Sequence, residues 1–130
     1  MGEVKKVFTD VDNEMLKMTP TKEEISKALK ASNQNSAPGT DGLTFLLYSV
    51  HWDILGDAML AMISDMWDSS ALTASQRISL MVFGKKPGKA NSLLPGDLRR
   101  ISLLNSGFKL ISSIKARRFK KTMTHTVSPL

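Results

Sequence analysis

The stretch "QRISLMVFGKKPGKANSLLPGDLRRISLL", residues 76–104, decides the fold class because its apolar residues alternate instead of recurring at helical spacing. Ile78, Leu80 and Val82 fall on one face of an extended run that ends at two lysines. A turn-rich segment of about a dozen residues leads from there into a second short run, residues 99–104. Two extended runs joined in this way predict an antiparallel two-stranded β-hairpin.

The residues on both sides of this hairpin have helical spacing. Upstream, "TPTKEEISKALKAS" has Thr21 followed three residues later by Glu24, which is typical of a helix N-terminus. A longer apolar stripe recurs at spacings of three and four, at Trp52, Leu55, Met59, Met62, Ile63, Met66 and Trp67. Downstream, Asn105 and Ser106 are expected to cap a helix with a buried stripe at Leu110, Ile111, Ile114 and Phe119. The prediction is an α+β fold, mostly helical with one antiparallel two-stranded β-hairpin.

Length and composition fit a single soluble domain. The 130 residues are 42% hydrophobic and 23% charged, and we expect an N-terminal extension at 1–18 followed by one domain at 19–130. No apolar run approaches the ~18 residues of a membrane span, and the N-terminus lacks the apolar core of a signal peptide. Because cysteine is also absent, we expect an intracellular protein, in the nucleus or the cytoplasm, with no membrane partner.

A loop with two glycines and a proline separates the first two helical patterns. It reads "KASNQNSAPGTDGLTF", residues 30–45, and it fits neither glycine-rich phosphate-binding pattern. Pro38 fixes one backbone angle, whereas Gly39 and Gly42 permit unusual backbone shapes and a close approach of another chain. Asp41 is expected to cap the helix that follows. We interpret the segment as a shaped loop, the alternative being a plain linker.

Charge is distributed unevenly along the chain. Residues 1–76 contain 6 Lys/Arg and 11 Asp/Glu, whereas residues 77–130 contain 12 Lys/Arg and one acid, Asp97. The second part therefore has a net charge of +11, and so much like charge repels itself unless a partner neutralises it. This half is predicted to bind a polyanion such as a nucleic acid, the alternative being a solvated face that only keeps the protein soluble.

Residues for catalysis or metal binding are scarce. No nucleophile has an adjacent base, and the two histidines, His51 and His125, lie far apart without carboxylates at ligand spacing. Four acids, Asp53, Asp57, Asp65 and Asp68, follow one helix, and we interpret them as a solvated helix face. We therefore predict no catalytic residue and no metal site in this chain.

Basic residues gather where the two strands meet the connecting segment. Lys85, Lys86 and Lys89 follow the first run, and Arg99 with Arg100 opens the second. Across an antiparallel hairpin these clusters would face each other and suit phosphates, which arginine binds as a fork and lysine as a point charge. The alternative is that they only protect the strand ends from edge pairing.

Three motifs in this order resemble the N-terminal part of the reverse transcriptases of non-LTR retrotransposons and their group II intron relatives. They are the loop Ser36–Gly42, the strand end Gly84-Lys85-Lys86-Pro87-Gly88, and Leu98–Asn105 with the sequence "LRRISLLN". The resemblance covers about residues 20–130. The chain departs from the family pattern at Gly84 and Arg100, which replace prolines, and at Leu98, which replaces an aromatic residue.

The resemblance implies the fingers subdomain, with the start of the palm, of a right-hand RNA-directed DNA polymerase. Lys85 and Arg99 would then hold the triphosphate of an incoming dNTP. Further residues expected to contact nucleic acid are Pro38, Gly39, Asp41, Gly42, Lys86, Lys89, Arg100, Arg117, Arg118 and Lys121. The family's metal-binding palm aspartates are not in this sequence, so we expect no cofactor here, Mg²⁺ only in the full-length polymerase, and no polymerisation by this part alone.

Other interpretations remain open from the sequence. The chain could be a stand-alone basic nucleic-acid-binding module without catalysis, using residues 106–124 against phosphates. It could also be a protein–protein module built on the methionine-rich helix. In the polymerase interpretation the partners are an RNA or DNA template, a dNTP and the rest of the palm. A homodimer through the exposed palm-facing surface is a further possibility.

Overall fold

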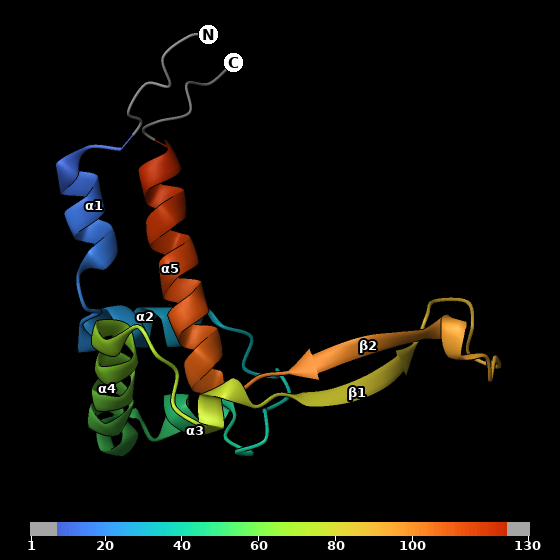
Figure 1. Cartoon of the computed structure of the whole chain (residues 1–130). Coiled ribbons are helices and arrows are strands. Elements are labelled where there is room, and N and C mark those ends of the chain that lie inside the picture. The colour runs from blue at the N-terminus through green and yellow to red at the C-terminus, as the bar shows by residue number, and fades with distance from the viewer. Residues whose placement is uncertain (1–7, 125–130) are drawn as a thin grey trace, which may run out of the picture.

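Five α-helices and one two-stranded sheet make up the part of the chain that the computed structural model describes, residues 8–124 (Figure 1). The helices are α1 (Asp10–Lys17), α2 (Lys22–Ala31), α3 (Phe45–Val50), α4 (Trp52–Ser69) and α5 (Ser106–Thr124). The strands are β1 (Leu80–Lys85) and β2 (Leu98–Leu103), each preceded by a short 3-10 turn, at Ser75–Arg77 and Pro95–Asp97. The mostly helical α+β fold with one antiparallel hairpin is confirmed.

The core lies between α2, α3, α4 and α5, with α2 in contact with the other three. α2 begins as predicted, because the Thr21 hydroxyl accepts a hydrogen bond from the Glu24 backbone N–H at 3.2 Å. The buried apolar side chains are Ile25, Ala28, Leu29, Phe45, Tyr48, Met59, Ile63, Met66, Leu110, Ile111 and Ile114. Since Met59 and Met66 are buried in this core, the methionine stripe of α4 packs inward, which removes support from the protein–protein interpretation.

The predicted helix after the loop is interrupted at His51. This residue ends α3 by donating its backbone N–H to the Leu47 carbonyl at 3.1 Å. It also starts α4, because its own carbonyl accepts the Leu55 N–H at 2.8 Å. α3 also faces the core, since Phe45 and Tyr48 are buried in the same cluster as Met59 of α4.

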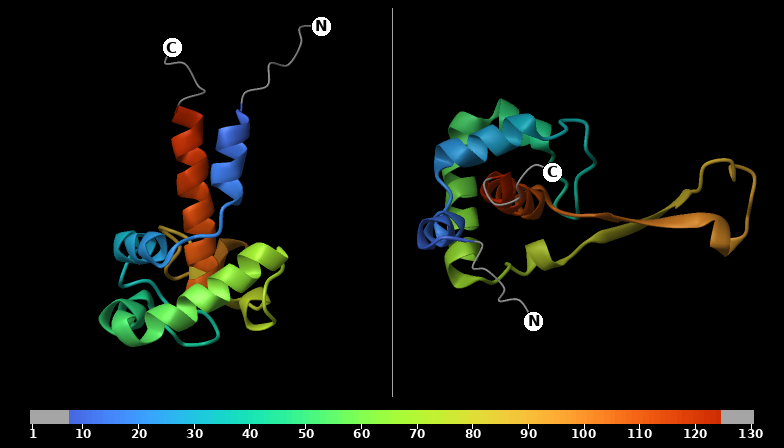
Figure 2. Two further views of the ribbon diagram at one scale, coloured as in Figure 1. Left: turned by 90° about the vertical axis from the view of Figure 1, so that its left-hand side faces the viewer. Right: turned by 90° about the horizontal axis from the view of Figure 1, so that it is seen from above.

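The end of α5 differs from the prediction. Phe119 was expected to be buried, but it is 50% exposed, because α1 is the described helix that lies along this end of α5 (Figures 1 and 2). The Phe119 ring packs on one side against Phe8, with 5.9 Å between ring centroids. α1 itself forms within the predicted extension and begins with a capping box between Thr9 and Asp12.

The hairpin projects away from the helices (Figures 1 and 2). β1 begins at Leu80, later than the alternating pattern suggested, because Ser75–Arg77 form a 3-10 turn. The strands pair from Leu80 opposite Leu103 to Lys85 opposite Leu98. No other described strand adds to this sheet, so both of its faces and both edges are open to solvent.

Candidate nucleic-acid interface

The loop at residues 36–42 is held against the segment that joins β2 to α5. Gly39 is buried, and a Cβ built on it would lie 2.2 Å from Asn105 Oδ1 and 2.5 Å from the Asn105 backbone nitrogen. The N–H of Gly42, which has a φ of +72°, donates to the Gly39 carbonyl at 3.2 Å and closes a turn. Gly39 was predicted to let another chain approach closely; in the structure the segment that lies against it is the protein's own β2–α5 junction.

Asp41 does not cap the following helix. Its carboxylate accepts the Leu43 backbone N–H at 3.0 Å, inside the loop. The N-cap of α3 is Thr44 instead, whose hydroxyl accepts the Leu47 N–H at 3.1 Å. The predicted cap was wrong because Thr44 directly precedes the helix.

Burial, and to a smaller extent the negative charge of Asp41, raises the pKa of Tyr48 above 10.0.

Two buried amides fix the root of the hairpin. Asn105 Oδ1 accepts the Asp41 backbone N–H at 3.2 Å, and its Nδ2 donates to the Ser75 carbonyl at 2.9 Å. Gln76 Oε1 accepts the Phe108 N–H at 2.9 Å and so caps the first turn of α5. Loop, hairpin and α5 are therefore joined at one point, and the hairpin leaves the helices in a fixed direction.

The register divides the hairpin into two faces, because paired residues point to the same side of a sheet and neighbours in a strand point to opposite sides. The Arg99 face carries Leu80, Val82 and Gly84 from β1, and Arg99, Ile101 and Leu103 from β2. The Phe83 face carries Met81, Phe83 and Lys85 from β1, and Leu98, Arg100 and Ser102 from β2. Lys85 and Arg99, predicted to act together, thus lie at the same end of the hairpin on opposite faces.

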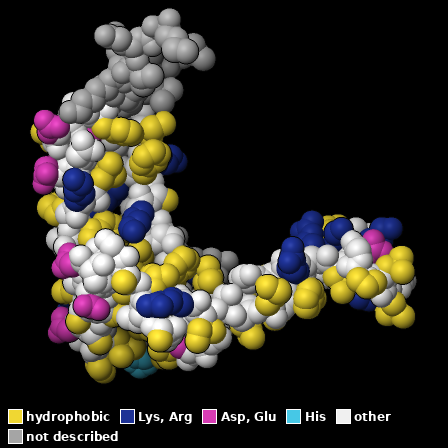
Figure 3. All heavy atoms as spheres, viewed as in Figure 1, with side chains coloured by type: hydrophobic (Ala, Val, Ile, Leu, Met, Phe, Trp, Pro, Cys, Tyr) yellow, Lys and Arg dark blue, Asp and Glu magenta, His cyan; other side chains and the backbone are white. Residues whose placement is uncertain are grey.

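The lysines near the tip are engaged within the hairpin. Lys85 donates to the Ala90 carbonyl, Lys86 donates to the Gly96 carbonyl at 2.6 Å, and Lys89 Nζ lies 3.9 Å from Asp97. Arg99 and Arg100 are exposed, and within residues 8–124 neither guanidinium forms a hydrogen bond or an ion pair. The space-filling view shows basic side chains gathered at this end of the hairpin, beside exposed apolar ones (Figure 3). Among the basic side chains of the hairpin, the two arginines are thus the most available to an anion.

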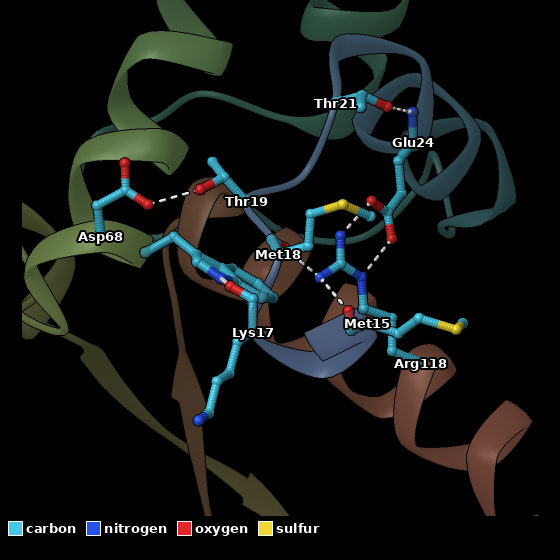
Figure 4. A network of polar contacts seen from close by, with 9 residues as sticks. Met15, Lys17, Met18, Thr19, Thr21, Glu24, Asp68 and Arg118 are labelled. Atoms are coloured by element: carbon cyan, nitrogen blue, oxygen red, sulfur yellow. Dashed lines mark hydrogen bonds and ion pairs between the residues drawn. The ribbon is translucent and has the colours of Figure 1, made fainter. Parts of the chain in front are cut away.

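The Arg118 side chain is mostly buried, and its guanidinium is bound by other groups of the protein. Its guanidinium donates two hydrogen bonds to Glu24, at 2.8 and 2.6 Å, and further bonds to the carbonyls of Met15 and Met18 (Figure 4). It also lies over the Trp67 ring, 5.0 Å from the centroid, and its side chain is 11% exposed. Arg118 therefore joins α1, α2, α4 and α5, and we leave it out of the candidate interface.

The other predicted basic residues of α5 are free. Arg117 and Lys121 are exposed, and no ion pair within the described residues occupies them. They lie toward the end of α5 that is remote from the hairpin root (Figure 1). The structure thus separates the predicted basic residues into a hairpin group and a group on α5.

Asn105 and Gln76 are the residues whose roles the sequence did not reveal. Asn105 was expected only as a helix cap, although its side chain joins loop and 3-10 turn. Gln76 gave no signal, because it acts on Phe108, 32 residues away. A buried amide with distant partners leaves no local pattern. Only its place as the last residue of the motif at Leu98–Asn105 could have marked Asn105.

The described residues, 8–124, contain neither a metal-binding cluster nor a membrane-spanning helix. No group of three or more His, Cys, Asp or Glu side chains there could hold a metal ion. Of the predicted solvated acids, Asp57 pairs with Lys22 at 2.8 Å, and Asp68 accepts a hydrogen bond from Thr19 at 2.6 Å. No described helix is long and apolar enough to cross a membrane.

Comparison with known proteins links the chain to a transposon. No protein-family model matches it. It is 28% identical over 123 residues to the "Transposon TX1 uncharacterized 149 kDa protein" of Xenopus laevis. The match covers 95% of this chain but 9% of the relative, so the chain spans a small part of the length of that protein. Similarity over nearly the whole chain to a transposon-encoded protein supports a transposon-derived origin.

Proposed function

We propose that this chain is the fingers region of a reverse transcriptase of the non-LTR retrotransposon type, and that it positions the template strand and the incoming nucleotide triphosphate. The observation that carries the proposal is the hairpin itself: a ribbon with an unpaired Arg99 that extends from a fixed root into solvent. The similarity to a transposon-encoded protein supports the proposal, because the polymerases that the sequence motifs resemble are also encoded by transposable elements.

Within this proposal the Arg99 face receives the triphosphate. Arg99 offers a planar fork of donors suited to phosphate oxygens, and the residue opposite it, Gly84, has no side chain to obstruct an approaching phosphate. Lys85, Lys86 and Lys89 add positive potential at the same end of the hairpin. For Lys85 to reach a phosphate directly, it must release the Ala90 carbonyl and turn around the strand end.

The loop at residues 36–42 would abut the template. Gly42 is exposed and has no side chain, so a nucleic-acid backbone can approach the loop closely. Because the loop is bonded to Asn105 at the hairpin root, template and nucleotide contacts would be held in a fixed relation. The rest of the palm, where the family holds its Mg²⁺, is the partner that this role requires.

A second candidate function is a stand-alone nucleic-acid-binding module, favoured by the free basic group on α5. Arg117, Lys120 and Lys121 are exposed on two adjacent turns and could bind phosphates of any sequence. In that case the hairpin arginines would contribute little.

Two variants distinguish the candidates. In the polymerase role, Arg99→Ala weakens binding of a dNTP to the chain in complex with template–primer, while general nucleic-acid affinity changes little. In the module role, Arg117→Ala combined with Lys121→Ala lowers the slope of log affinity against log salt by about 2, whereas Arg99→Ala has little effect. Binding of labelled dNTP and of a labelled oligonucleotide, each over a salt series, measures both. Both candidates fail if neither variant changes nucleic-acid or nucleotide binding.

A further inference from the structure

We infer that the Phe83 face of the hairpin is a stacking platform for an unpaired base of single-stranded nucleic acid, with Phe83 as the platform and Arg100 as the cation beside it. The inference rests on the proposed function, which it deepens by naming the side chains and the state of the strand that they recognise. It concerns the face that does not carry Arg99.

Phe83 is an aromatic side chain without a partner. It is 62% exposed in the middle of the ribbon, and no ring contact or cation–π contact engages it within residues 8–124. Most proteins bury a phenylalanine in their core, yet this one lies on a hairpin that projects away from the core (Figures 1 and 3). A flat exposed ring of this kind is a surface on which a base can stack.

The charge around Phe83 identifies the class of partner. Arg100 is the residue directly opposite Phe83, and Lys85 follows on the same face, which carries no acid. The acid closest in sequence, Asp97, accepts a hydrogen bond from Ser92 and lies near Lys89. A purely apolar partner would desolvate Arg100 without pairing it, at a cost. A nucleotide instead offers the ring a base and the guanidinium a phosphate.

The same chemistry favours a single strand over a duplex. In a duplex the faces of the bases are covered by their neighbours, so Phe83 could reach one only after unstacking it. An unpaired base has a free face and can lie on the ring at no such cost. The Arg99 face differs, because its apolar residues are the aliphatic Leu80, Val82, Ile101 and Leu103.

The test compares Phe83→Leu, Phe83→Trp and the unchanged chain. The probes are a short single-stranded oligonucleotide with one central 2-aminopurine and the duplex of the same sequence, both followed by fluorescence. We expect Phe83→Leu to lose about 5- to 100-fold in affinity for the single strand, together with the quenching of 2-aminopurine. Phe83→Trp should retain both, and duplex affinity should be the same for all three proteins. The salt slope should not change in Phe83→Leu, since no charge is removed.

Leu93→Ala is the matched control, because Leu93 is an apolar side chain at the hairpin tip that is 92% exposed and lies outside both strands. The inference is overturned if Phe83→Leu binds the single strand as well as the unchanged chain does, or if Leu93→Ala loses as much. It is also overturned if Phe83→Leu changes only the sedimentation of the protein, since the face would then bind a second copy. If the unchanged chain binds neither nucleotide nor nucleic acid, the proposed function fails as well. If Arg99→Ala weakens dNTP binding as expected but Phe83→Leu has no effect, only this inference fails and the proposed function is retained.

Discussion

Gly39 shows how a single residue joins two distant segments. A Cβ at this position would lie 2.5 Å from the Asn105 backbone nitrogen and 2.6 Å from the Leu104 carbonyl carbon, and backbone cannot move aside as a flexible side chain can. We expect Gly39→Ala to lower the free energy of unfolding by about 1–3 kcal/mol through this overpacking. Urea unfolding followed by tryptophan fluorescence measures the change. Gly96→Ala is the control, with nothing within 4 Å of its Cβ, and an equal loss there would contradict the argument.

Tyr48 provides a second prediction at this scale. Its pKa is raised above 10.0 because burial disfavours the phenolate and the charge of Asp41 adds to the effect. Since the unfolded chain releases this proton first, the contribution of Tyr48 to stability is complete below pH 10 and is lost as the pH rises toward the folded pKa. The chain has one tyrosine, so absorbance at about 295 nm reports this group alone. Asp41→Asn should lower the midpoint pH of the Tyr48 titration. An unchanged midpoint would exclude an effect of the Asp41 charge on the pKa of Tyr48.

Single residues were predictable where their effect is local. Gly42 was predicted to permit an unusual backbone shape and has a φ of +72°, whereas the segment that lies tightly against Gly39 is the protein's own Asn105. What the sequence could not supply was the partner, because Asn105 lies 64 positions after Asp41, whose N–H it accepts. Asp41 was assigned a cap that Thr44 provides, since both residue types favour that position and only the backbone decides between them.

At the scale of elements, one arginine attaches α1 to the rest of the protein. Arg118 donates to carbonyls at the end of α1 and pairs with Glu24 of α2, while the Trp67 indole N–H donates to the Lys17 carbonyl at 3.0 Å. We expect Arg118→Lys to release α1, because an ammonium cannot reproduce the planar fork that serves both partners. Hydrogen exchange measured by mass spectrometry should show faster exchange over residues 10–17.

The neighbouring Arg117 is the matched control for that experiment. It is exposed on the same helical turn, so Arg117→Lys should leave exchange in α1 unchanged. For nucleic-acid binding we expect the opposite: loss of Arg117 matters and loss of Arg118 does not. Arg117→Ala should reduce the slope of log affinity against log salt by about 1, whereas Arg118→Ala should not change it, because the Arg118 guanidinium pairs with Glu24. If loss of Arg118 lowers the slope and loss of Arg117 does not, the assignment of these residues is wrong.

Elements were predictable wherever periodicity changed. The change from helical spacing to alternation located the hairpin, and Thr21 located the start of α2. The break between α3 and α4 was not predicted, because neither glycine nor proline marks it and both helices bury apolar residues in the same core. The prediction that Phe119 is buried was also wrong. Periodicity shows which side of a helix is apolar, but it does not show how far the neighbouring helices extend along that side.

At the scale of the whole molecule, a helical body with a packed core supports a hairpin without one. The two strands contact each other, while their apolar side chains on both faces remain exposed. An isolated two-stranded hairpin is marginally stable, so its order depends on the root at Asn105 and Gln76 and on any partner that covers it. The helical body thus sets the position of the hairpin, and a partner that covered the hairpin would add to its stability.

Because the helices share a packed core and the hairpin has none, we expect their backbone amides to differ in protection from hydrogen exchange in the free protein. Amides of β1 and β2 should exchange much faster than those of α2 and the first turns of α5, because opening the hairpin exposes little additional apolar surface. Adding a single-stranded oligonucleotide should slow exchange in the strands and leave α2 unchanged, since binding stabilises only the part that it contacts. Hydrogen exchange with and without the oligonucleotide, at low and high salt, measures both effects. The prediction is contradicted if the strands of the free protein are as protected from hydrogen exchange as α2. If the free protein also sediments as a dimer, a second copy of the chain covers the hairpin.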